Sequence, residues 1–594
     1  MIYYFDIETN AISNFATLEG LEVVFVLVAI DSDGNVHKAT TDKQIKELLE
    51  KMSEAEAIVG HNVIGFDLPV LHKLYNFSHK HVYDTIVMSR CIYPDIRDAD
   101  FNRKEFPKPL IGSHSLKAWG YRLGVQKDAH GDTESWEKLT PEMVSYCEQD
   151  VVVTKALADY LWYTEPSPQM IQLEHDFAKI IRKQEFNGFP FDNKKAEALC
   201  SKLTAERVQL KQELQEVFEP EVVQMKSFWY VDQAGNKYPS KKAAMEVGVK
   251  DPQKGPHKTK QIPFNPNSRD QIAERLMNLG WKPEAYDGKR PKIDETVLKG
   301  IGKPEADKLC KYLLLTKRLG QISEGNQAWL KMSREGSIHG SVITNGAVSG
   351  RCTHRNPNVA QVPAVRAEYG YECRELFHAP KETVLVGADA SGLELRCLAH
   401  YLHPFDNGAY GKEILEGDIH TANQKAAGLN TRDQAKTFIY AFLYGAGDAK
   451  IGSIVSGSNA QGRRLKESFM QKTPAIKKLL QAVNNKVKIS RSLKGLDGRI
   501  LTCRSAHSAL NLLLQSAGAV VMKQALVEFV YLAKKPYNLH ANVHDEIQFS
   551  CDAQHAEELG ETFQKAMRAA GDKLNFRCQL DSEYKIGANW AETH

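Results

Sequence analysis

The alternation of apolar and polar residues predicts an α/β fold for residues 1–165. An apolar strand is expected over 2–5 and a second over 22–30, which turns at the Asp-Ser-Asp-Gly-Asn segment 31–35. Residues 42–57 have the period of an amphipathic helix, whose apolar face comprises Ile45, Leu48, Leu49 and Met52. Strands that alternate with helices along a chain are typical of a sheet covered by helices.

A break in the helical pattern separates this region from the rest of the chain. The segment 163–170 contains two prolines and a serine, and we assign 166–170 as a linker between an N-terminal domain (1–165) and a C-terminal region (171–594). Helical periodicity resumes after residue 171 and is strong over 196–218.

Residues 219–263 are rich in lysine, proline and glycine and contain an isolated aromatic trio, Phe228, Trp229 and Tyr230. This composition, between two helical stretches, predicts a solvated insertion. After it, helices and short strands alternate to the last residue. The whole chain is therefore expected to be a multidomain protein of α/β and α+β class.

Two apolar strand patterns in the C-terminal region end at acids. The run Val-Leu-Val-Gly-Ala over 384–388 leads into Asp389, and a helix is expected over 391–400. Near the end of the chain, apolar residues alternate on both sides of His544, Asp545 and Glu546, which predicts a hairpin with these three residues at its tip. Charged residues at a tight turn are usually only solvated, so the hairpin alone does not establish a function.

A helix between these strands has a cationic face. Thr431 and Gln434 have the spacing of a capping box, and Gly445 is expected to end the helix. Arg432, Lys436 and Tyr440 are spaced by four residues and lie within about 80° of one another around the helix. Such a stripe could bind a nucleoside triphosphate, because cations attract phosphates and an aromatic ring packs against a sugar. The alternative is a helix that merely extends its cations into water.

Composition narrows the class of protein. The chain has 594 residues, 42% hydrophobic and 25% charged, which excludes a disordered chain and allows roughly four domains. We find no apolar run long enough to span a membrane and no secretory signal, and the ten cysteines form no Cys-x-x-Cys pair. A reducing cytoplasm fits this pattern. The net charge is only +3, so a nucleic-acid surface would have to be a local patch.

The N-terminal domain contains a second set of acids. Asp6 and Glu8 point to the same face of the first strand, where both carboxylates could share one cation. Asp67 interrupts an apolar stretch, and Tyr146 lies one helical turn before Asp150. Four acids can hold two divalent ions that activate water for attack on a phosphate, with the tyrosine orienting the water. Taken alone, an Asp-x-Glu pair is usually solvated surface.

This set resembles the proofreading 3′–5′ exonucleases of the DEDD superfamily, tyrosine subtype. Further along, the segments DASGLELR, RDQAKTFIYAFLYG and VHDE resemble motifs A, B and C of the family A (polymerase I type) DNA polymerases. The segment 346–363 resembles that family's primer-template contact segment. Within the family, the chain looks most like the replicative polymerases of short-tailed phages.

The resemblance implies an RNase H-like exonuclease domain followed by a right-hand polymerase domain. The thumb would span about 185–335 and include the insertion 219–263. The palm would comprise about 336–415 and 505–594, and the fingers about 416–504. The implied activities are replicative DNA synthesis by two-metal phosphoryl transfer and 3′–5′ proofreading.

The resemblance also implies a role for individual residues. Asp389, Asp545 and the backbone carbonyl of Ala390 would hold two Mg²⁺ ions, and Asp6, Glu8, Asp67 and Asp150 two divalent ions at the exonuclease site. The residues implied to bind the incoming nucleotide are Arg432, Lys436 and His420 at the phosphates, Tyr440 and Glu394 at the sugar, and Tyr444 and Gly445 beside the templating base. The residues implied to contact the DNA minor groove are Arg351, Gln515 and His544.

The implied partners are primer-template DNA, deoxynucleoside triphosphates, a phage helicase-primase and a single-strand binding protein, in the cytoplasm of a bacterial host. Host thioredoxin could bind the insertion 219–263; alternatively, the lysines of this insertion could contact duplex phosphates directly. Two other functions are a related single-subunit RNA polymerase or primase and an inert DNA-binding replication factor. Glu394 and the exonuclease acids argue against the first, and the complete sets of acids against the second.

Overall fold

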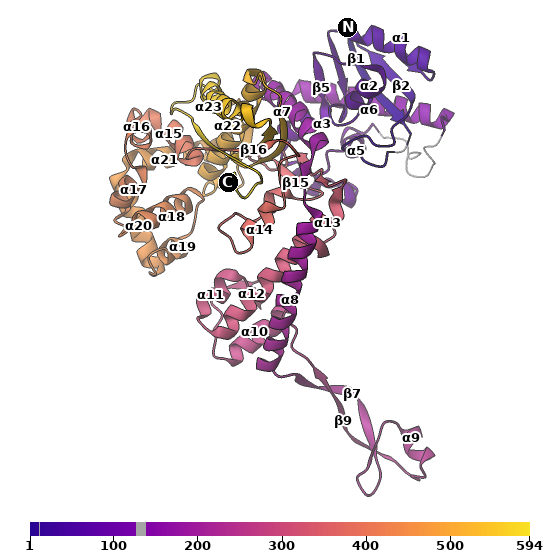
Figure 1. Cartoon of the computed structure of the whole chain (residues 1–594), viewed down its shortest axis with the longest axis vertical. Coiled ribbons are helices and arrows are strands. Elements are labelled where there is room, and N and C mark those ends of the chain that lie inside the picture. Colours follow the sequence, from indigo (N-terminus) through magenta and orange to yellow (C-terminus); the bar gives the residue numbers. More distant parts are fainter. Residues whose placement is uncertain (11, 126–137) are drawn as a thin grey trace. The chain divides into compact units, whose positions relative to one another are not determined.

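The computed structural model describes residues 1–10, 12–125 and 138–594, which divide into two compact units (Figure 1). Unit 1 comprises Met1–Phe191 together with Ser333–His594, and unit 2 comprises Asp192–Met332. Unit 1 contains both sets of acids that the sequence singles out, and unit 2 contains the insertion 219–263.

The N-terminal part of unit 1 is built on a five-stranded sheet with the order β3-β2-β1-β4-β5. β1 runs antiparallel to β2 and parallel to β4. The strands are β1 (Ile2–Thr9), β2 (Val24–Asp31), β3 (Val36–Ala39), β4 (Ala57–Gly60) and β5 (Val82–Asp84). The helices are α1 (Asp42–Ser53), α2 (Asp67–Tyr75), α3 (Thr85–Ile92), α4 (Ile96–Phe101), α5 (Leu116–Leu123) and α6 (Pro141–Tyr163).

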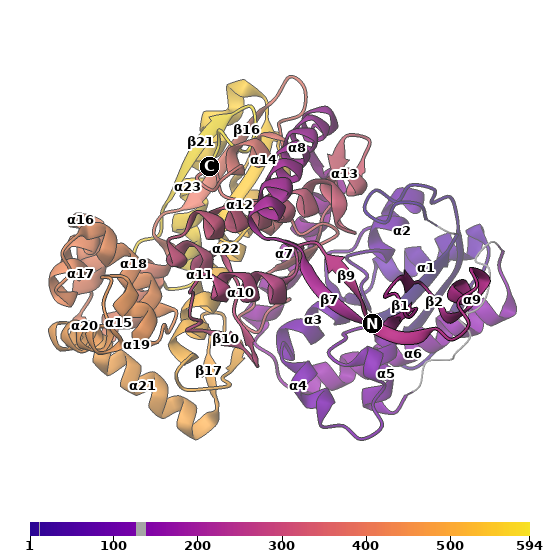
Figure 2. The ribbon, with the colours of Figure 1, turned by 90° about the horizontal axis from the view of Figure 1, so that it is seen from below.

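Helices cover both faces of this sheet because side chains alternate along β2. Leu27 and Ala29 belong to a core with α1, whereas Val26 and Val28 belong to a core with α6. Figure 2 shows α6 beside β1 and β2. The four apolar residues predicted to form one face of the first helix are the buried residues of α1, so this prediction is confirmed.

The connection that follows α6 is shorter than the sequence suggests. α7 (Pro168–Asn187) begins inside the predicted linker 166–170, with Ser167 as its N-cap and Pro168 in its first turn. The prediction is wrong here because proline ends most helices but is favoured at the first position of one. The Ser167 hydroxyl also donates to the backbone carbonyl of Asp497, 2.5 Å away, so the connection is anchored to the C-terminal part of unit 1.

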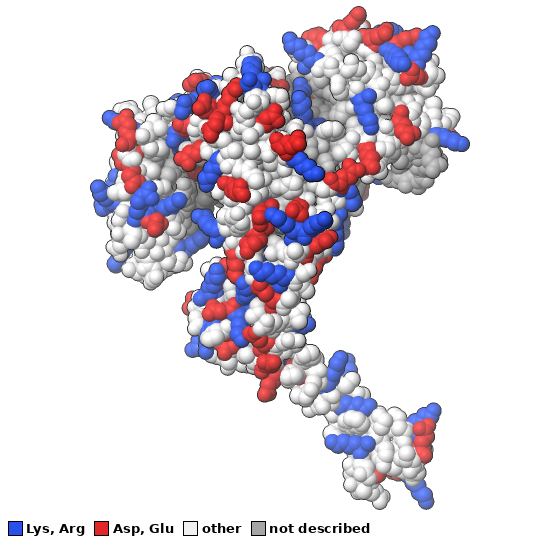
Figure 3. Space-filling view, viewed as in Figure 1, with Lys and Arg blue, Asp and Glu red and all other residues white. Residues whose placement is uncertain are grey.

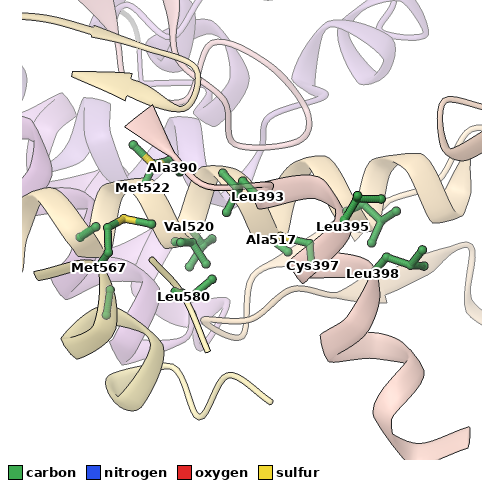
Figure 4. Close-up of a cluster of buried hydrophobic side chains, with 14 of the residues drawn as sticks. Ala390, Leu393, Leu395, Cys397, Leu398, Ala517, Val520, Met522, Met567 and Leu580 are labelled. Atoms are coloured by element: carbon green, nitrogen blue, oxygen red, sulfur yellow. The ribbon is translucent and has the colours of Figure 1, made fainter. Parts of the chain in front are cut away.

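The C-terminal part of unit 1 contains a four-stranded sheet with the order β19-β20-β16-β21. Its strands are β16 (Val384–Ala390), β19 (Asn538–Val543), β20 (Glu546–Cys551) and β21 (Ser582–Gly587). The helices α15 (Leu393–Asp406), α22 (Ala509–Leu532) and α23 (Ala556–Lys573) contribute to its core. In Figure 4, Leu393 lies beside Val520 and Cys397 lies beside Ala517 of α22, which ties the segment after β16 to the longest helix of this part.

A group of helices lies between α15 and α22 in the sequence. These are α16 (Ala409–Glu416), α17 (Ile419–Ala427), α18 (Arg432–Leu443), α19 (Asp448–Ser453), α20 (Asn459–Lys472) and α21 (Pro474–Ser490). Unit 1 also contains the strands β6 (Phe189–Pro190), β12 (Ser333–Arg334), β13 (Ser337–Ile338), β14 (Ser341–Ile343), β15 (Thr353–Arg355), β17 (Ser492–Lys494) and β18 (Ile500–Thr502) and the helix α14 (Gly370–Glu375). The predicted capping box of α18 is present, and Gly445 lies just after the helix with φ +68°, as expected for a glycine that ends a helix.

Unit 2 is a helical body with a β-ribbon. The helices are α8 (Asn193–Val217), α9 (Lys241–Glu246), α10 (Arg269–Asn278), α11 (Glu295–Ile301), α12 (Pro304–Leu319) and α13 (Trp329–Met332). The strands are β7 (Glu221–Val231), β8 (Lys237–Tyr238), β9 (Gln253–Ile262), β10 (Tyr286–Asp287) and β11 (Arg290–Pro291). The insertion is solvated as predicted, but β7 and β9 pair antiparallel in it, and Figure 3 shows cationic side chains along this ribbon.

Two expectations from composition can be compared with the structure. All ten cysteines are free thiols, as predicted. Within the described residues, α22 is long and apolar enough to cross a membrane by length and composition, but 78% of its apolar window is buried inside the protein. Its composition is therefore explained by its position in the core of unit 1.

Candidate active sites

The acids predicted at the end of one strand and at the tip of a hairpin meet at the same edge of the C-terminal sheet. β16 pairs antiparallel with β20, with Asp389 opposite Glu546. The backbone N–H of Ala390 donates to the backbone carbonyl of Asp545 at 2.9 Å. Asp389 and Asp545, more than 150 residues apart in the chain, are thus brought together by backbone pairing.

Burial and mutual repulsion raise the pKa values of Asp389 and Asp545 and so disfavour their ionised forms. Burial raises the pKa of Asp389 to about 7, and the carboxylates of Asp545 and Glu546 add to the rise. Burial also raises the pKa of Asp545, as does the nearby Glu394. A divalent cation would remove this repulsion, and carboxylate oxygens are ligands that Mg²⁺ and Mn²⁺ prefer.

The predicted hairpin is present, with His544 and Asp545 as its turn, but Glu546 lies beside the turn and not within it. It is the first residue of β20 and is only 5% exposed. Its carboxylate accepts a hydrogen bond from Trp590 Nε1 at 2.5 Å, and Arg374 lies 3.5 Å away. These contacts come from distant segments of the chain, so the local sequence pattern gave no sign that the side chain would be buried.

A small cavity of about 50 Å³ adjoins Asp545. The predicted residues Arg351, Glu394 and His544 all line it. The phenol of Tyr444 donates to Glu394 Oε1 at 3.1 Å, so Glu394 connects this cavity to the end of α18. Burial lowers the pKa of His544, and Arg351 lowers it further, which favours a neutral imidazole beside Asp545.

α18 presents the predicted stripe of cations. Arg432 and Lys436 are exposed and Tyr440 is partly buried, whereas Ala435 and Phe438 on the other face are in the core. Burial raises the pKa of Tyr440 to about 12, and Glu394 is the first of the neighbouring anions that add to this rise. The stripe therefore leads toward the acids of the sheet.

Of the other residues predicted to bind nucleotide or DNA, His420 lies near this stripe and Gln515 lies on a different helix. His420 lies on α17 with its ring centroid 6.5 Å from that of Tyr440. Arg432 forms an ion pair with Asp418, 2.8 Å away, so its guanidinium already has a carboxylate partner. Gln515 lies on α22, where its side chain donates to Asn511 at 3.0 Å. Gln515 does not line the small cavity beside Asp545.

The acids of the N-terminal sheet form a second cluster. Ligand atoms of Asp6, Glu8 and Cys147 lie within 4.8 Å of one another. Asp67, at the start of α2, is buried, and its Oδ1 accepts a hydrogen bond from the backbone N–H of Ile7 at 3.3 Å. Asp150 on α6 lines the same cavity as Asp6. The structure therefore brings the four predicted acids together, and Tyr146 lies on α6 one turn before Asp150.

Two residues at this cluster were not predicted from the sequence. Asp84 is 1% exposed, and its carboxylate accepts backbone hydrogen bonds from Asn62, at 2.8 Å, and from Ile86 at the start of α3. The position of Asp84 between an apolar strand and a helix is a signal for a capping residue. Cys147 follows Tyr146 directly, and its thiol lies 3.4 Å from the Asp6 carbonyl oxygen.

Burial also raises the pKa values of two acids in this second cluster, Asp67 and Asp84. The pKa of Asp67 rises to about 7, mainly through burial, and Asp84 and Asp150 contribute. The pKa of Asp84 rises to about 6 for the same main reason. The donors are predominantly carboxylate oxygens in a polar cavity, and this chemistry suits hard divalent cations.

The cavity beside these acids has a volume of about 450 Å³. Asp6, Asp84 and Asp150 line it, together with residues of α7 and of the hairpin β14–β15. The pocket is large enough for a nucleotide-sized ligand, since small-molecule sites usually measure about 300–1,000 Å³.

A sheet edge with paired acids, next to a cationic helix, has the chemistry that a nucleotidyltransferase of the polymerase type requires. The family model described as DNA polymerase family A matches residues 238–592. The chain is 38% identical to the DNA-directed DNA polymerases of Escherichia phage T7 and Enterobacteria phage T3, over 90% of this chain and 92% of each relative. The chain belongs to DNA polymerase family A and is a DNA-directed DNA polymerase.

A solved structure extends the comparison to the fold. The polymerase domain of Pol1 from M. smegmatis, solved with primer-template DNA and a dNTP, superimposes with a TM-score of 0.75 at 16% identity. The match covers 99% of this chain and 96% of that one. The fold is therefore the right-hand fold of these polymerases, and the enzyme, as a family member, depends on divalent metal ions.

Proposed function

We propose that Asp389 and Asp545 hold two Mg²⁺ ions during nucleotide addition, together with the backbone carbonyl of Ala390. Their raised pKa values and the pairing of β16 with β20 support this assignment, because the acids are held close despite their repulsion. Bound there, the ions would make the primer 3′-hydroxyl a better nucleophile and would stabilise the charge of the leaving pyrophosphate.

The residues of α18 and α17 would position the incoming nucleotide. Lys436 and His420 would contact the phosphates, and Arg432 would exchange Asp418 for the terminal phosphate. Tyr440 would pack against the sugar, and Glu394 would fill the space that a ribose 2′-hydroxyl needs. The exposed cations of α18 and the contact of Tyr444 with Glu394 support this arrangement.

Residues at the polymerase cavity would also test whether the base pair at the primer end has the correct shape. Arg351 and His544, which line the cavity, and Gln515 would contact minor-groove acceptors that all correct base pairs share. Tyr444 and Gly445, at the end of α18, would border the templating base.

We also propose that the N-terminal cluster is a 3′–5′ exonuclease that proofreads the primer. Asp6, Glu8, Asp67 and Asp150 would hold two divalent ions, and Tyr146 would orient the attacking water. The single observation that carries this proposal is the convergence of the four acids beside an open cavity.

Separate activity assays test both assignments. Asp6→Ala should abolish degradation of a single-stranded oligonucleotide while primer extension with Mg²⁺ continues. Asp545→Ala should have the opposite effect. Loss of both activities from either substitution, in protein with an unchanged melting temperature, would contradict the assignment of separate sites.

The ribbon of unit 2 supports a role in holding the enzyme on its template. Lys254 lies over the Phe228 ring at 5.3 Å, and Lys258 lies over the Trp229 ring at 5.1 Å. We propose that unit 2 is the thumb and that its ribbon binds a replication partner, with host thioredoxin as the candidate. The phage relatives support a bacterial cytoplasm as the place of action. Primer-extension lengths measured with and without thioredoxin, at several salt concentrations, would distinguish this from direct DNA contact.

A further inference from the structure

Two arginines line the cavity of the N-terminal cluster without a role in the chemistry proposed above. Arg90 lies on α3, and Arg355 is the last residue of β15. Both line the 450 Å³ cavity that Asp6 and Asp150 also line. Arg355 comes from the C-terminal part of the chain, so the cavity is completed by a residue outside the N-terminal sheet.

These two guanidinium groups differ from a third in the same cavity. Arg182 donates to the backbone carbonyls of Ala16, at 2.8 Å, and Phe15, at 3.2 Å, so its hydrogen bonds fix the local fold. Among the described residues, the guanidinium groups of Arg90 and Arg355 form no side-chain hydrogen bond or ion pair with another protein group. Their donors are therefore available to a ligand in the cavity.

The cavity is lined by both carboxylates and cations, and the two arginines repel each other in it. Burial lowers the pKa of Arg90, Asp84 raises it, and Arg355 lowers it, which shows that the two guanidinium groups lie close enough to repel each other. The nearby Glu185 is already engaged, since its Oε1 accepts from the backbone N–H of Val342 at 2.7 Å. A phosphate matches guanidinium geometry and would relieve the repulsion.

The strand that carries Arg355 is held firmly in place. Arg355 pairs with Ser341 of β14, and the contact between Val342 and Glu185 attaches β14 to α7. The same hairpin carries Arg351, four residues earlier, in the polymerase cavity. A fully extended chain of four residues spans at most about 14 Å, so one hairpin supplies a cation to each of the two cavities.

We propose that Arg355, together with Arg90, binds a backbone phosphate of the unpaired primer strand in the exonuclease cavity. The inference rests on the proposed exonuclease function and adds a substrate-binding residue from the polymerase part of the chain. A phosphate contact is independent of sequence, as excision of any mismatched end requires. Arg351 and Arg355 belong to one hairpin. A primer end that leaves Arg351 in the polymerase cavity would therefore find Arg355, in the exonuclease cavity, only four residues further along the same chain segment.

The test measures degradation of a 5′-labelled single-stranded oligonucleotide in Mg²⁺. Arg355→Gln should raise the KM about tenfold, as loss of one charge-assisted contact predicts, with kcat within about twofold of wild type. The slope of log KM against log salt should fall by about 0.7, the value for one phosphate contact on a single strand. Arg355→Lys, which keeps the charge, should restore most of the affinity.

Arg334→Gln is the matched control, since Arg334 is exposed on β12 and does not line the cavity. It should leave both the KM and the extension of a matched primer unchanged, and Arg355→Gln should weaken degradation of the oligonucleotide more than it weakens primer extension. An Arg355→Gln enzyme with the KM of wild type would overturn the inference, as would an equal loss of primer extension. A wild-type enzyme that does not degrade the oligonucleotide would instead refute the proposed exonuclease.

Discussion

Replacing Glu174 by glutamine should destabilise unit 1 strongly, because Glu174 is the centre of a buried charge network. The residue is 0% exposed. Its carboxylate accepts from Lys523 Nζ at 2.8 and 2.9 Å, from Arg499 Nη2 at 2.5 Å and from Asn345 at 2.6 Å. Arg499 has a second partner in Asp497, at 2.6 Å, but Lys523 forms no other ion pair among the described residues. Glu174→Gln thus leaves a buried ammonium without a countercharge.

The magnitude follows from this geometry. Removal of one partner of a buried pair typically costs about 3–5 kcal/mol. Unit 1 has roughly 450 residues, for which the entropy of unfolding is about 1 kcal/mol per kelvin. The melting temperature should therefore fall by about 3–5 °C, a shift that scanning calorimetry resolves.

A surface pair provides the control for this experiment. Lys155 and Asp159 lie 2.9 Å apart but are partly exposed, so Asp159→Asn should shift the melting temperature by less than about 1 °C. Adding Lys523→Met to Glu174→Gln removes the unpaired charge and should recover at least half of the loss. A Glu174→Gln protein that melts like the Asp159→Asn control would refute the reasoning.

Two further predictions concern the active sites. Tyr440→Phe should increase discrimination against dideoxynucleotides by about 10- to 100-fold, because the phenol can replace the hydrogen bond of the missing 3′-hydroxyl; equal discrimination in single-nucleotide incorporation assays would contradict this. In metal-free protein, the pKa values of Asp389 and Asp67 near 7 lie above their unfolded values, so their contribution to stability is lost as the pH rises from about 4 to above 7. Mg²⁺ binds the ionised acids, so it should raise the melting temperature more at pH 8 than at pH 5.5, and an equal rise at both would refute the assignment.

The elements of the fold were predictable from the sequence where one face of an element is buried. The apolar face of α1 and the capping box at Thr431 are local signals, and both are present in the structure. The strands around Asp389 and Asp545 were predictable from their apolar residues, although the structure buries both faces of these strands. Their pairing was suggested only by the resemblance, since no local pattern specifies the register of two strands so far apart in the chain.

Contacts between distant segments account for most of what the sequence did not reveal. Glu174 and Lys523 are 349 residues apart, and no local pattern around either residue indicates that they form an ion pair in the core. Arg355 remains exposed in the structure, and only the pairing of β15 with β14 reveals that it lines the cavity of the N-terminal cluster. The strands of the ribbon in unit 2 could not be predicted from the sequence. Strands that are exposed on both faces lack the alternation of apolar and polar residues by which a strand is recognised.

Removing the charge of Glu174 and removing the charge of Asp545 should have opposite effects on the stability of the fold. Glu174 faces cations, so its charge stabilises the fold, whereas Asp545 faces Glu394 and Glu546, and its pKa is raised. Backbone pairing, and not attraction between side chains, holds Asp545 in place. Asp545→Asn should therefore leave the melting temperature of metal-free protein at pH 8 unchanged or raise it by about 1 °C, while it abolishes primer extension. A fall as large as that expected for Glu174→Gln would mean that the acids of the polymerase site stabilise the fold, and that their repulsion has been overestimated.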